Sequence, residues 1–319
     1  MLGGKFRDQV RVYCDTDAEK PSGTETGKRL RARMERGFTF LKMDLGLMQI
    51  AHIPGAVTAP AGALEGFRAN PRGRGGTLEE RKARNLAYDA QNVQHPFTGL
   101  HFTEKGIDLL EQYIHEVREV IGYEIPLAID HVGHISLQDG IRLSRRIEKY
   151  VPAWLEDVIP WQYTEQYRQL QQATSVPICT GEDIYLKEGF EPLLRSGGLS
   201  VIHPDLLTSG GILETKKIAA MAEAYHIQVA PHCYCGPIVG AANIQLAVTL
   251  PNFLILESLK QWDGFHATLL KKKIEWQDGN VIPSKEPGLG VELDEAICDA
   301  HPYSGKDLHL QMMQTPLMP

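Results

Sequence analysis

The chain has 319 residues, of which 43% are hydrophobic and 23% are charged, and its formal net charge is −7. These values are typical of a folded globular protein and argue against a general nucleic-acid-binding protein, whose surface is usually basic. The sequence has no run of about 18 apolar residues, so no membrane span is expected, and its N-terminus lacks the apolar core of a signal peptide. We therefore expect a cytoplasmic protein without a nucleic-acid or membrane partner.

The N-terminal region predicts two strands and one helix. Val10–Asp15 is β-prone and alternates in polarity, and Phe38–Asp44 reads in the same way, so these are the first and second predicted strands. Thr24–Arg36 between them is predicted to be a helix. Lys42 and Asp44 are two residues apart, so their side chains face the same side of the second strand.

Residues 45–102 are far longer than a normal connection between a strand and a helix. They contain the basic cluster Pro71–Gly76 and a predicted helix at Thr77–Gln91, with Thr77 as its cap and Glu80 three residues later. This insertion is expected to lie over the end of the sheet where the second strand finishes. Its arginines form either a solvated loop or a lid that contacts an anionic substrate.

From residue 103 onward, predicted helices and strands alternate. The helices cover Thr103–Ile121, Leu137–Lys149, Thr164–Thr174, Ile184–Arg195, Ile212–Tyr225 and Ile238–Val248. The strands cover Glu124–Asp130, Pro152–Glu156, Val176–Gly181, Leu199–His203, Ile227–Pro231 and Asn252–Glu257. This alternation predicts a parallel sheet in an α/β fold, and eight strands in all predict a (β/α)8 TIM-type barrel. We expect one domain over residues 1–319, with the barrel at about 9–257, the long insertion after strand 2 and a C-terminal tail at 258–319.

The last six apolar runs each finish on a carboxylate or an imidazole. The intervals between these residues are 26, 26, 23, 27 and 25, about the length of one strand, one helix and two short loops. In a (β/α)8 barrel, catalytic groups lie at the C-terminal ends of the strands. The six residues are Asp130, Glu156, Glu182, Asp205, His232 and Glu257.

Three of these acids form a candidate metal site. Asp130, Glu156 and Glu182 follow three successive strands, and neighbouring strands lie about 4.8 Å apart, so the carboxylates can converge on one cation. Three carboxylates suit Mg²⁺, which keeps water or substrate in its remaining positions. The alternative is that each carboxylate caps the next helix or pairs with a neighbouring base.

A histidine and an aspartate form a candidate acid/base pair. Asp205 and His232 finish neighbouring strands, so the carboxylate can fix the tautomer of the imidazole and raise the basicity of its other nitrogen. A purely structural histidine is the alternative. Cys233 and Cys235 are a further possible metal pair, but no second thiol pair accompanies them, and ordinary residues at the barrel mouth are the favoured interpretation.

These segments resemble the barrel domain of the enolase superfamily, in its mandelate racemase subgroup. The matching pieces are Leu155–Asp157, Thr180–Glu182, Asp205 with Ser209–Ile212, Ala230–His232, Leu256–Glu257 and Pro287–Leu293. The resemblance implies that Mg²⁺ is held by Asp130, Glu156 and Glu182. It also implies that His232 and Asp205 are the acid/base dyad and that Glu257 hydrogen-bonds the carboxylate of the substrate.

The chemistry that this set implies is removal of a proton alpha to a carboxylate. That removal leaves an ene-diolate, whose negative charge a divalent cation and Lys42 would stabilise while His232 takes the proton. The racemases of this subgroup carry Lys-x-Lys on strand 2, whereas here Asp44 replaces the second lysine. Inversion needs groups on both faces of the substrate, but elimination of water needs one base and an acid. We therefore expect a sugar-acid dehydratase, with a racemase or epimerase as the alternative.

Two further features refine this expectation. Ala230–Pro237 also resembles galactonate-type dehydratases, which place an additional histidine two residues after the first metal ligand. Val132 stands there in this chain, with His131 and His134 near it. His134 is a candidate second acid, and a solvated loop histidine is the alternative. His134 and Asp44 are predicted to contact the substrate.

The superfamily normally has an α+β capping domain before the barrel. This chain starts near the first barrel strand, so we expect either a truncated reading frame or an uncapped barrel. A catalytically silent barrel that binds a sugar acid or a partner is therefore a further alternative. The expected ligand is a small acid sugar, and the expected assembly is a homo-oligomer.

Overall fold

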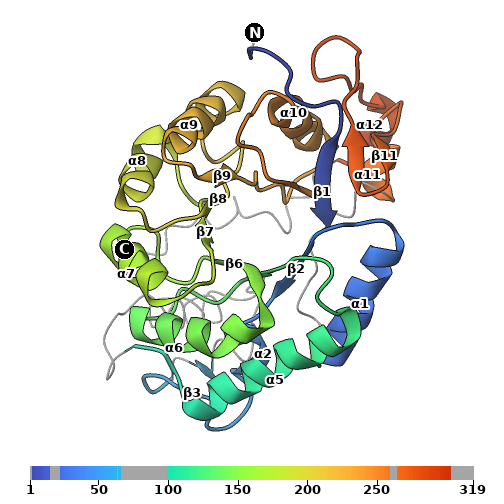
Figure 1. Cartoon of the computed structure of the whole chain (residues 1–319). Coiled ribbons are helices and arrows are strands. Elements are labelled where there is room, and N and C mark those ends of the chain that lie inside the picture. The colour runs from blue at the N-terminus through green and yellow to red at the C-terminus, as the bar shows by residue number, and fades with distance from the viewer. Residues whose placement is uncertain (1, 15–21, 63, 66–98, 259–263, 303–319) are drawn as a thin grey trace.

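Helices surround a set of parallel strands, as Figure 1 shows for this computed structural model. The structure describes residues 2–14, 22–62, 64–65, 99–258 and 264–302. The parallel strands are β1 (Val10–Cys14), β2 (Leu41–Asp44), β5 (Leu127–Asp130), β6 (Pro152–Glu156), β7 (Ile178–Thr180), β8 (Val201–Ile202), β9 (Gln228–Val229) and β10 (Leu256–Ser258). The surrounding helices are α1 (Gly23–Glu35), α5 (Glu104–Ile121), α6 (Leu137–Ile147), α7 (Thr164–Ala173), α8 (Leu186–Ser196), α9 (Ile212–Ala224) and α10 (Pro237–Ala247).

Hydrogen-bonded pairing runs through the strands in chain order. Parallel ladders join β2, β5, β6, β7, β8 and β9 in that sequence. A parallel bridge between Val229 and Phe253 continues the order toward β10, and β10 pairs in parallel with β1. Within the described ranges no ladder joins β1 to β2, although Arg11 Nε donates to Thr39 Oγ1 at 2.8 Å. The predicted α/β class and parallel order are therefore confirmed, while a ladder closed around all eight strands is not observed.

The centre of this strand set is filled by side chains. Each strand, or the residue beside it, contributes one member of a buried hydrophobic cluster: Tyr13, Phe40, Ala128, Trp154, Cys179, Val201, Ala230 and Ile255. The Trp154 ring lies 4.9 Å from the Phe40 ring and 6.3 Å from the Tyr13 ring, measured between centroids. An interior packed from every strand is the arrangement that a small barrel requires. Because Glu156 follows Trp154 by two residues in β6, its side chain leaves the strand just above this layer.

The predicted elements agree with the observed ones except at their ends. Strands β8 and β9 are two residues long, shorter than the predicted 199–203 and 227–231. Pairing continues beyond them as single hydrogen bonds, from His203 N to Thr180 O at 3.0 Å and from Ala230 N to Ile202 O at 2.9 Å. After α6 the chain continues as a 3₁₀ turn, η1 (Glu148–Tyr150), and Val151 then adopts a positive φ of 51°.

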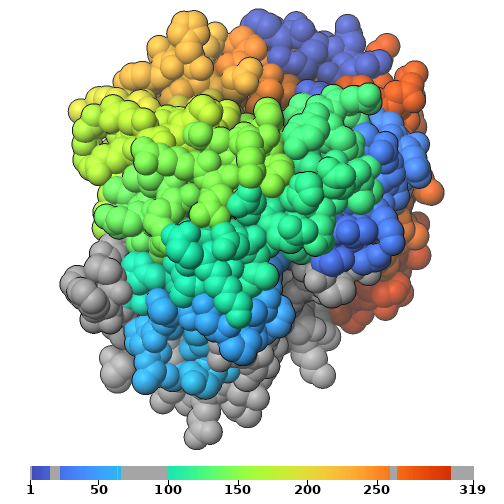
Figure 2. All heavy atoms as spheres, turned by 60° about the horizontal axis from the view of Figure 1, so that its bottom comes forward, coloured from blue at the N-terminus to red at the C-terminus, as the bar shows by residue number. Residues whose placement is uncertain are grey.

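The described base of the insertion packs on the outer helices. It contains α2 (Leu47–Ile50) and an antiparallel pair, β3 (Val57–Thr58) with β4 (His101–Phe102). Lys105 Nζ at the start of α5 donates to Pro54 O at 2.7 Å, and Figure 2 shows this light-blue segment against the teal of α5. The predicted helix 77–91 and the basic cluster 71–76 lie outside the described residues. The expected position of the insertion over the strand ends therefore stays a prediction.

The tail extends the sheet beside β1. Strands β11 (Glu275–Gln277) and β12 (Asn280–Ile282) form a hairpin, and β12 pairs antiparallel with β1. The short helices α11 (Phe265–Thr268) and α12 (Glu295–Ala300) flank it. The tail predicted at 258–319 thus contains two strands and two short helices among its described residues. Within the described part of the chain, no helix combines the length and apolar character needed to cross a membrane.

The contact between α1 and α5 gives a test of this packing. A Cβ added at Gly23 would lie 2.1 Å from Tyr113 O and 2.8 Å from Glu116 Cβ, so the backbones of the two helices would have to separate. We expect Gly23→Ala to lower the free energy of unfolding by about 1–3 kcal/mol, measured by urea denaturation. Thr24→Ala, at the exposed next position, should change little. Equal stability of the two variants would show that the helices do not meet at Gly23.

Candidate active site

One lysine and three acids meet at the C-terminal ends of the strands. Lys42 Nζ in β2 lies 2.6 Å from Asp130 Oδ2 of β5, 3.5 Å from Glu156 Oε1 of β6 and 3.0 Å from Glu257 Oε1 of β10. The four side chains are all buried. The parallel register places Asp44 opposite Asp130, so β2 and β5 end together at this site.

The charges of this group follow from its burial. Burial alone would lower the pKa of Lys42, but the attraction of its three carboxylates outweighs burial and raises that pKa well above the ordinary value. Burial would raise the pKa of Asp130, yet His131 and Lys42 hold it well below the usual range. Against the same burial effect, Lys42 and His232 hold the pKa of Glu257 well below its usual range. The site therefore contains a stable ammonium ion beside the ionised carboxylates of Asp130 and Glu257.

In a second group of acids, nearby cations do not offset the effect of burial on the carboxyl pKa values. Oxygen atoms of Glu156, Asp157 and Glu182 lie within 4.8 Å of one another. Burial, reinforced by the neighbouring acids, raises the pKa of Glu156 well above its usual range and that of Glu182 to about 8. Glu156 Oε1 is buried and has no hydrogen-bond partner among the described residues. Hard oxygen donors with excess negative charge fit Mg²⁺.

The structure brings the three predicted metal ligands to one region but not into one tight cluster. Glu156 and Glu182 belong to the group just described. Asp130 instead contacts Lys42 and forms a group with Asp44 and His131. The assignment of Asp130, Glu156 and Glu182 as the ligand set stays a prediction, with Asp157 as an additional neighbour.

The predicted hydrogen bond between Asp205 and His232 is present, and His232 Nδ1 lies 2.8 Å from Asp205 Oδ2. The other oxygen of Asp205 accepts from the backbone nitrogens of Leu207 at 2.7 Å and Thr208 at 2.9 Å, which fixes the carboxylate. His232 Nε2 then lies 3.2 Å from Glu182 Oε2. Burial would lower the pKa of His232, but Glu257, Asp205 and Glu182 raise it to about 10. The catalytic role of the dyad stays a prediction.

The two predicted substrate contacts lie at the rim. Asp44 Oδ1 is 3.1 Å from Nδ1 of His131, whose side chain is 59% exposed. His134 is half-buried in the loop after β5, and its backbone nitrogen donates to Asp157 O at 3.4 Å. His131, which the sequence analysis named only as a neighbour of Val132, has its Nδ1 3.4 Å from Asp130 Oδ2, and this carboxylate raises the pKa of His131.

His203 is a site residue that the sequence analysis missed. It is fully buried, its Nδ1 contacts Ala230 O, and its Nε2 lies 3.3 Å from Glu156 Oε1 and 3.7 Å from Glu257 Oε2. It was read only as the last residue of a strand. The available signal was its spacing, because His203 precedes Asp205 by two residues and can therefore face the same side.

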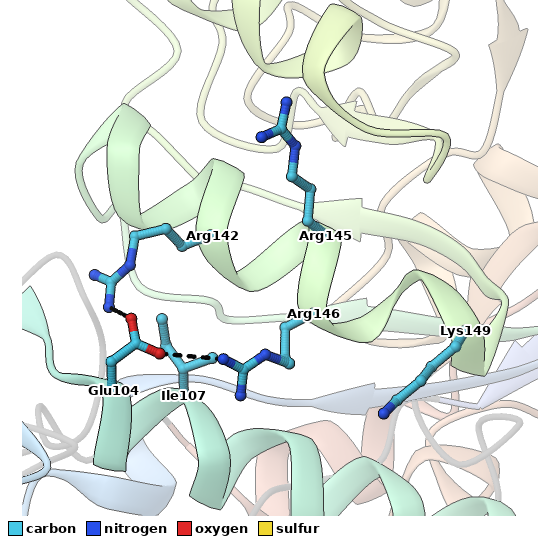
Figure 3. Close-up of a pocket in the computed structure, with 6 residues that line it drawn as sticks. All are labelled: Glu104, Ile107, Arg142, Arg145, Arg146 and Lys149. Atoms are coloured by element: carbon cyan, nitrogen blue, oxygen red, sulfur yellow. Dashed lines mark hydrogen bonds and ion pairs between the residues drawn. The ribbon is translucent and has the colours of Figure 1, made fainter.

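A pocket of about 440 Å³ on the outer surface is a different feature. Figure 3 shows that it lies between α5 and α6 and that Glu104 pairs with both Arg142 and Arg146. Lys149 of the same pocket pairs with Glu111. Carboxylates of α5 thus balance these cations of α6. The pocket is an ion-pair network of the helix layer, away from the strand ends.

The ammonium at the centre of the site gives a stability test. We expect Lys42→Met to lower the free energy of unfolding by about 3–5 kcal/mol, because buried carboxylates lose their cation. The carboxyl pKa values that Lys42 depresses contribute stability above the unfolded pKa of about 4. The loss should therefore be largest at neutral pH and shrink as the pH falls.

Urea denaturation in the presence of a chelator measures this effect. Lys28→Met is the matched control, since Lys28 forms an exposed pair with Glu25 and should matter little. A loss that is equal for the two variants, or independent of pH, would contradict the assigned charges.

Comparison with known proteins agrees with this geometry. The profile of the family described as enolase C-terminal domain-like matches residues 25–297. The chain is 30% identical over 310 residues to a D-xylonate dehydratase of Haloferax volcanii, an alignment that covers 97% of this chain and 65% of that protein. It is 34% identical over 306 residues to a D-galactonate dehydratase of Ralstonia pickettii, with 93% of this chain and 66% of that protein covered.

A solved structure gives the same result. A mandelate racemase/muconate lactonizing enzyme from Sulfitobacter sp. is 30% identical and matches with a TM-score of 0.74, covering 96% of this chain and 68% of that one. The chain thus spans about two thirds of the length of the relatives named here. The matched range contains every strand-end residue described above. The chain therefore belongs to the enolase C-terminal domain-like family.

Proposed function

We propose that the strand-end site removes the proton alpha to the carboxylate of an acid sugar and eliminates water, with Mg²⁺ as cofactor. The observation that carries this proposal is the position of His232. Its Nδ1 is held by Asp205, while its Nε2 faces Glu182 and Glu257, and Glu257 also contacts Lys42. The names of the relatives, D-xylonate and D-galactonate dehydratase, support an acid sugar as the substrate.

His232 is the proposed base. A carbonyl or carboxylate oxygen only accepts hydrogen bonds, so contact with Asp205 places a hydrogen on Nδ1 and leaves Nε2 to take or give the proton. Glu257, Asp205 and Glu182 raise the pKa of His232, which favours a proton on Nε2. Binding Glu182 to a cation would remove one of these influences and lower that pKa toward working pH.

Mg²⁺ is proposed to bind Asp130, Glu156 and Glu182, with Asp157 beside them. When bound, it supplies positive charge that stabilises the ene-diolate. Lys42 supplies a second positive charge to the same site, because its raised pKa keeps it protonated. Glu257 holds no proton in this arrangement, since its pKa is well below the usual range. Its proposed hydrogen bond to a substrate carboxylate therefore requires proton uptake when the substrate binds.

The leaving hydroxyl needs an acid. His134 is the residue proposed from the sequence, with Asp44 as a second substrate contact. The structure adds His131, which is more exposed than His134 and is paired with Asp44. Asp44 can keep a proton on His131 even when Asp130 is engaged elsewhere, so His131 is a second candidate acid.

A racemase or epimerase is the alternative enzyme. It would need a base on the face opposite His232, where Asp44 replaces the second lysine, and Asp44 is paired with His131. A catalytically silent barrel that binds a sugar acid is the non-enzymatic alternative. The hydrogen-bonded dyad of Asp205 and His232 and the buried ammonium of Lys42 favour a catalytic function instead. A homo-oligomer remains the proposed assembly.

The dyad gives the first test of the reaction. With D-xylonate or D-galactonate and Mg²⁺ in deuterated water, we expect exchange of the alpha proton and formation of a keto acid. His232→Asn should lower turnover by about 10²–10⁴ because the base is lost, while Mg²⁺ affinity stays unchanged. Proton NMR follows the exchange and a keto-acid assay follows the product.

Lys42 is the competing base, and the same experiment separates the two. Residual exchange in His232→Asn that disappears when Lys42 is also changed to Met would assign the proton transfer to Lys42. Exchange without keto-acid formation would favour the racemase or epimerase. Binding of the sugar acid without exchange would favour the silent barrel.

The metal site has its own test. Metal ions are first removed from the protein with a chelator, and Mg²⁺ is then added in steps. The melting temperature should rise, because the metal binds only the folded state. Glu182→Gln should weaken that effect strongly, since one charged ligand is lost. Glu188→Gln on the exposed face of α8 is the control and should leave it intact. Equal Mg²⁺ responses in both variants would remove Glu182 from the ligand set.

A further inference from the structure

We propose that Glu182, His203 and His232 form a second cation site, specific for a divalent transition metal such as Zn²⁺. Their ligand atoms lie within 4.8 Å of one another. Two imidazoles and one carboxylate favour zinc, cobalt, nickel or iron, whereas Mg²⁺ prefers oxygen ligands alone. This site therefore differs in chemistry from the proposed set of carboxylates, although the two share Glu182.

The first argument is the orientation of His203. Its Nδ1 contacts the carbonyl oxygen of Ala230, which can only accept, so Nδ1 carries the hydrogen. The neutral ring then presents a lone pair at Nε2. This nitrogen is fully buried and has no hydrogen-bond partner within the described ranges. The atoms it faces are Glu156 Oε1 at 3.3 Å and Glu257 Oε2 at 3.7 Å. A lone pair turned toward ionised carboxylates is repelled unless a proton or a metal cation lies between them.

The second argument is that His232 is oriented in the same way. Asp205 accepts the hydrogen of Nδ1, so a neutral His232 also presents a lone pair at Nε2. That atom lies 3.2 Å from Glu182 Oε2. The two imidazole rings meet edge to face with centroids 5.2 Å apart. Histidines that bind metals usually donate their other N–H to a carboxylate or a carbonyl, and these two histidines show one example of each.

A competing group contains Glu156, Cys179 and His203. Cys179 belongs to the hydrophobic layer that fills the strand set, and all three side chains are buried. The site proposed here is more open, because the side chains of Glu182 and His232 are 25% and 16% exposed. A hydrated cation can therefore reach Glu182 and His232 first and then engage the free nitrogen of His203.

The consequence for catalysis rests on the proposed function. A metal on His232 Nε2 would occupy the lone pair that takes the alpha proton. Zn²⁺ would therefore inhibit the dehydratase reaction, and raising the Mg²⁺ concentration should relieve that inhibition. Because both ions use Glu182, their binding should also be competitive.

Calorimetric titration of the Mg²⁺-free protein with Zn²⁺ tests the site directly. We expect His203→Gln to weaken Zn²⁺ binding by about 100-fold or more, since glutamine offers no imidazole, and to leave the stabilisation by Mg²⁺ intact. His226→Gln, at an exposed position in the turn after α9, should bind Zn²⁺ like the unmodified chain. Co²⁺ used as a spectroscopic probe should show visible absorption bands that His203→Gln and His232→Asn both remove.

Three outcomes would overturn the inference: no Zn²⁺ binding, unchanged binding in His203→Gln, or loss of binding in Cys179→Ser. If His203→Gln does not fold, His232→Asn carries the same test, because that side chain is not in the interior. The Zn²⁺-binding result does not depend on whether the chain catalyses the dehydratase reaction. Zn²⁺ binding that depends on His203 in a chain without turnover would leave the site standing and reject the dehydratase, whereas turnover that Zn²⁺ does not inhibit would do the reverse.

Discussion

The ammonium of Lys42 holds the strand ends of this protein together. It contacts acids from β5, β6 and β10, so residues that are far apart in the chain share one buried charge. Without it, those carboxylates would face one another across a site from which water is excluded. The proposed mechanism uses the same charge to stabilise an ene-diolate. One interaction thus serves both the fold and the proposed chemistry, and its position depends on the parallel register of β2 with β5.

The balance of charge explains why a further cation is expected. Lys42 satisfies Asp130 and Glu257, whose pKa values fall, but not Glu156 or Glu182, whose pKa values rise. Glu156 at the end of β6 and Glu182 after β7 are therefore acids whose charge Lys42 does not compensate. Mg²⁺ would supply the missing positive charge while binding oxygen ligands alone. A transition metal would also bind the imidazoles of His203 and His232. Which ion binds decides whether His232 Nε2 remains available for a proton.

Much of this arrangement was predictable because a parallel fold repeats. Strand and helix lengths fix the interval between strand ends, and this interval identified Asp130, Glu156 and His232 from spacing alone. The hydrogen bond between His232 and Asp205 followed from neighbouring strands. What the repeat does not encode is the side-chain direction within a strand end. Asp130 turns toward Lys42 and Asp44 pairs with His131, because local charge rather than spacing selects these partners. His203 was missed because its one signal in the sequence was its spacing of two residues from Asp205, inside an otherwise apolar run.

The central claim is that the acids at the ends of β5, β6 and β7 share one cation next to His232. A crystal structure with Mn²⁺ in place of Mg²⁺ tests it most directly, because anomalous scattering locates the ion. The account predicts one peak within coordination distance of Asp130, Glu156 and Glu182, with Asp130 turned away from Lys42 and His232 Nε2 uncoordinated. A peak elsewhere, or Asp130 still bound to Lys42 with the ion held by other residues, would contradict it.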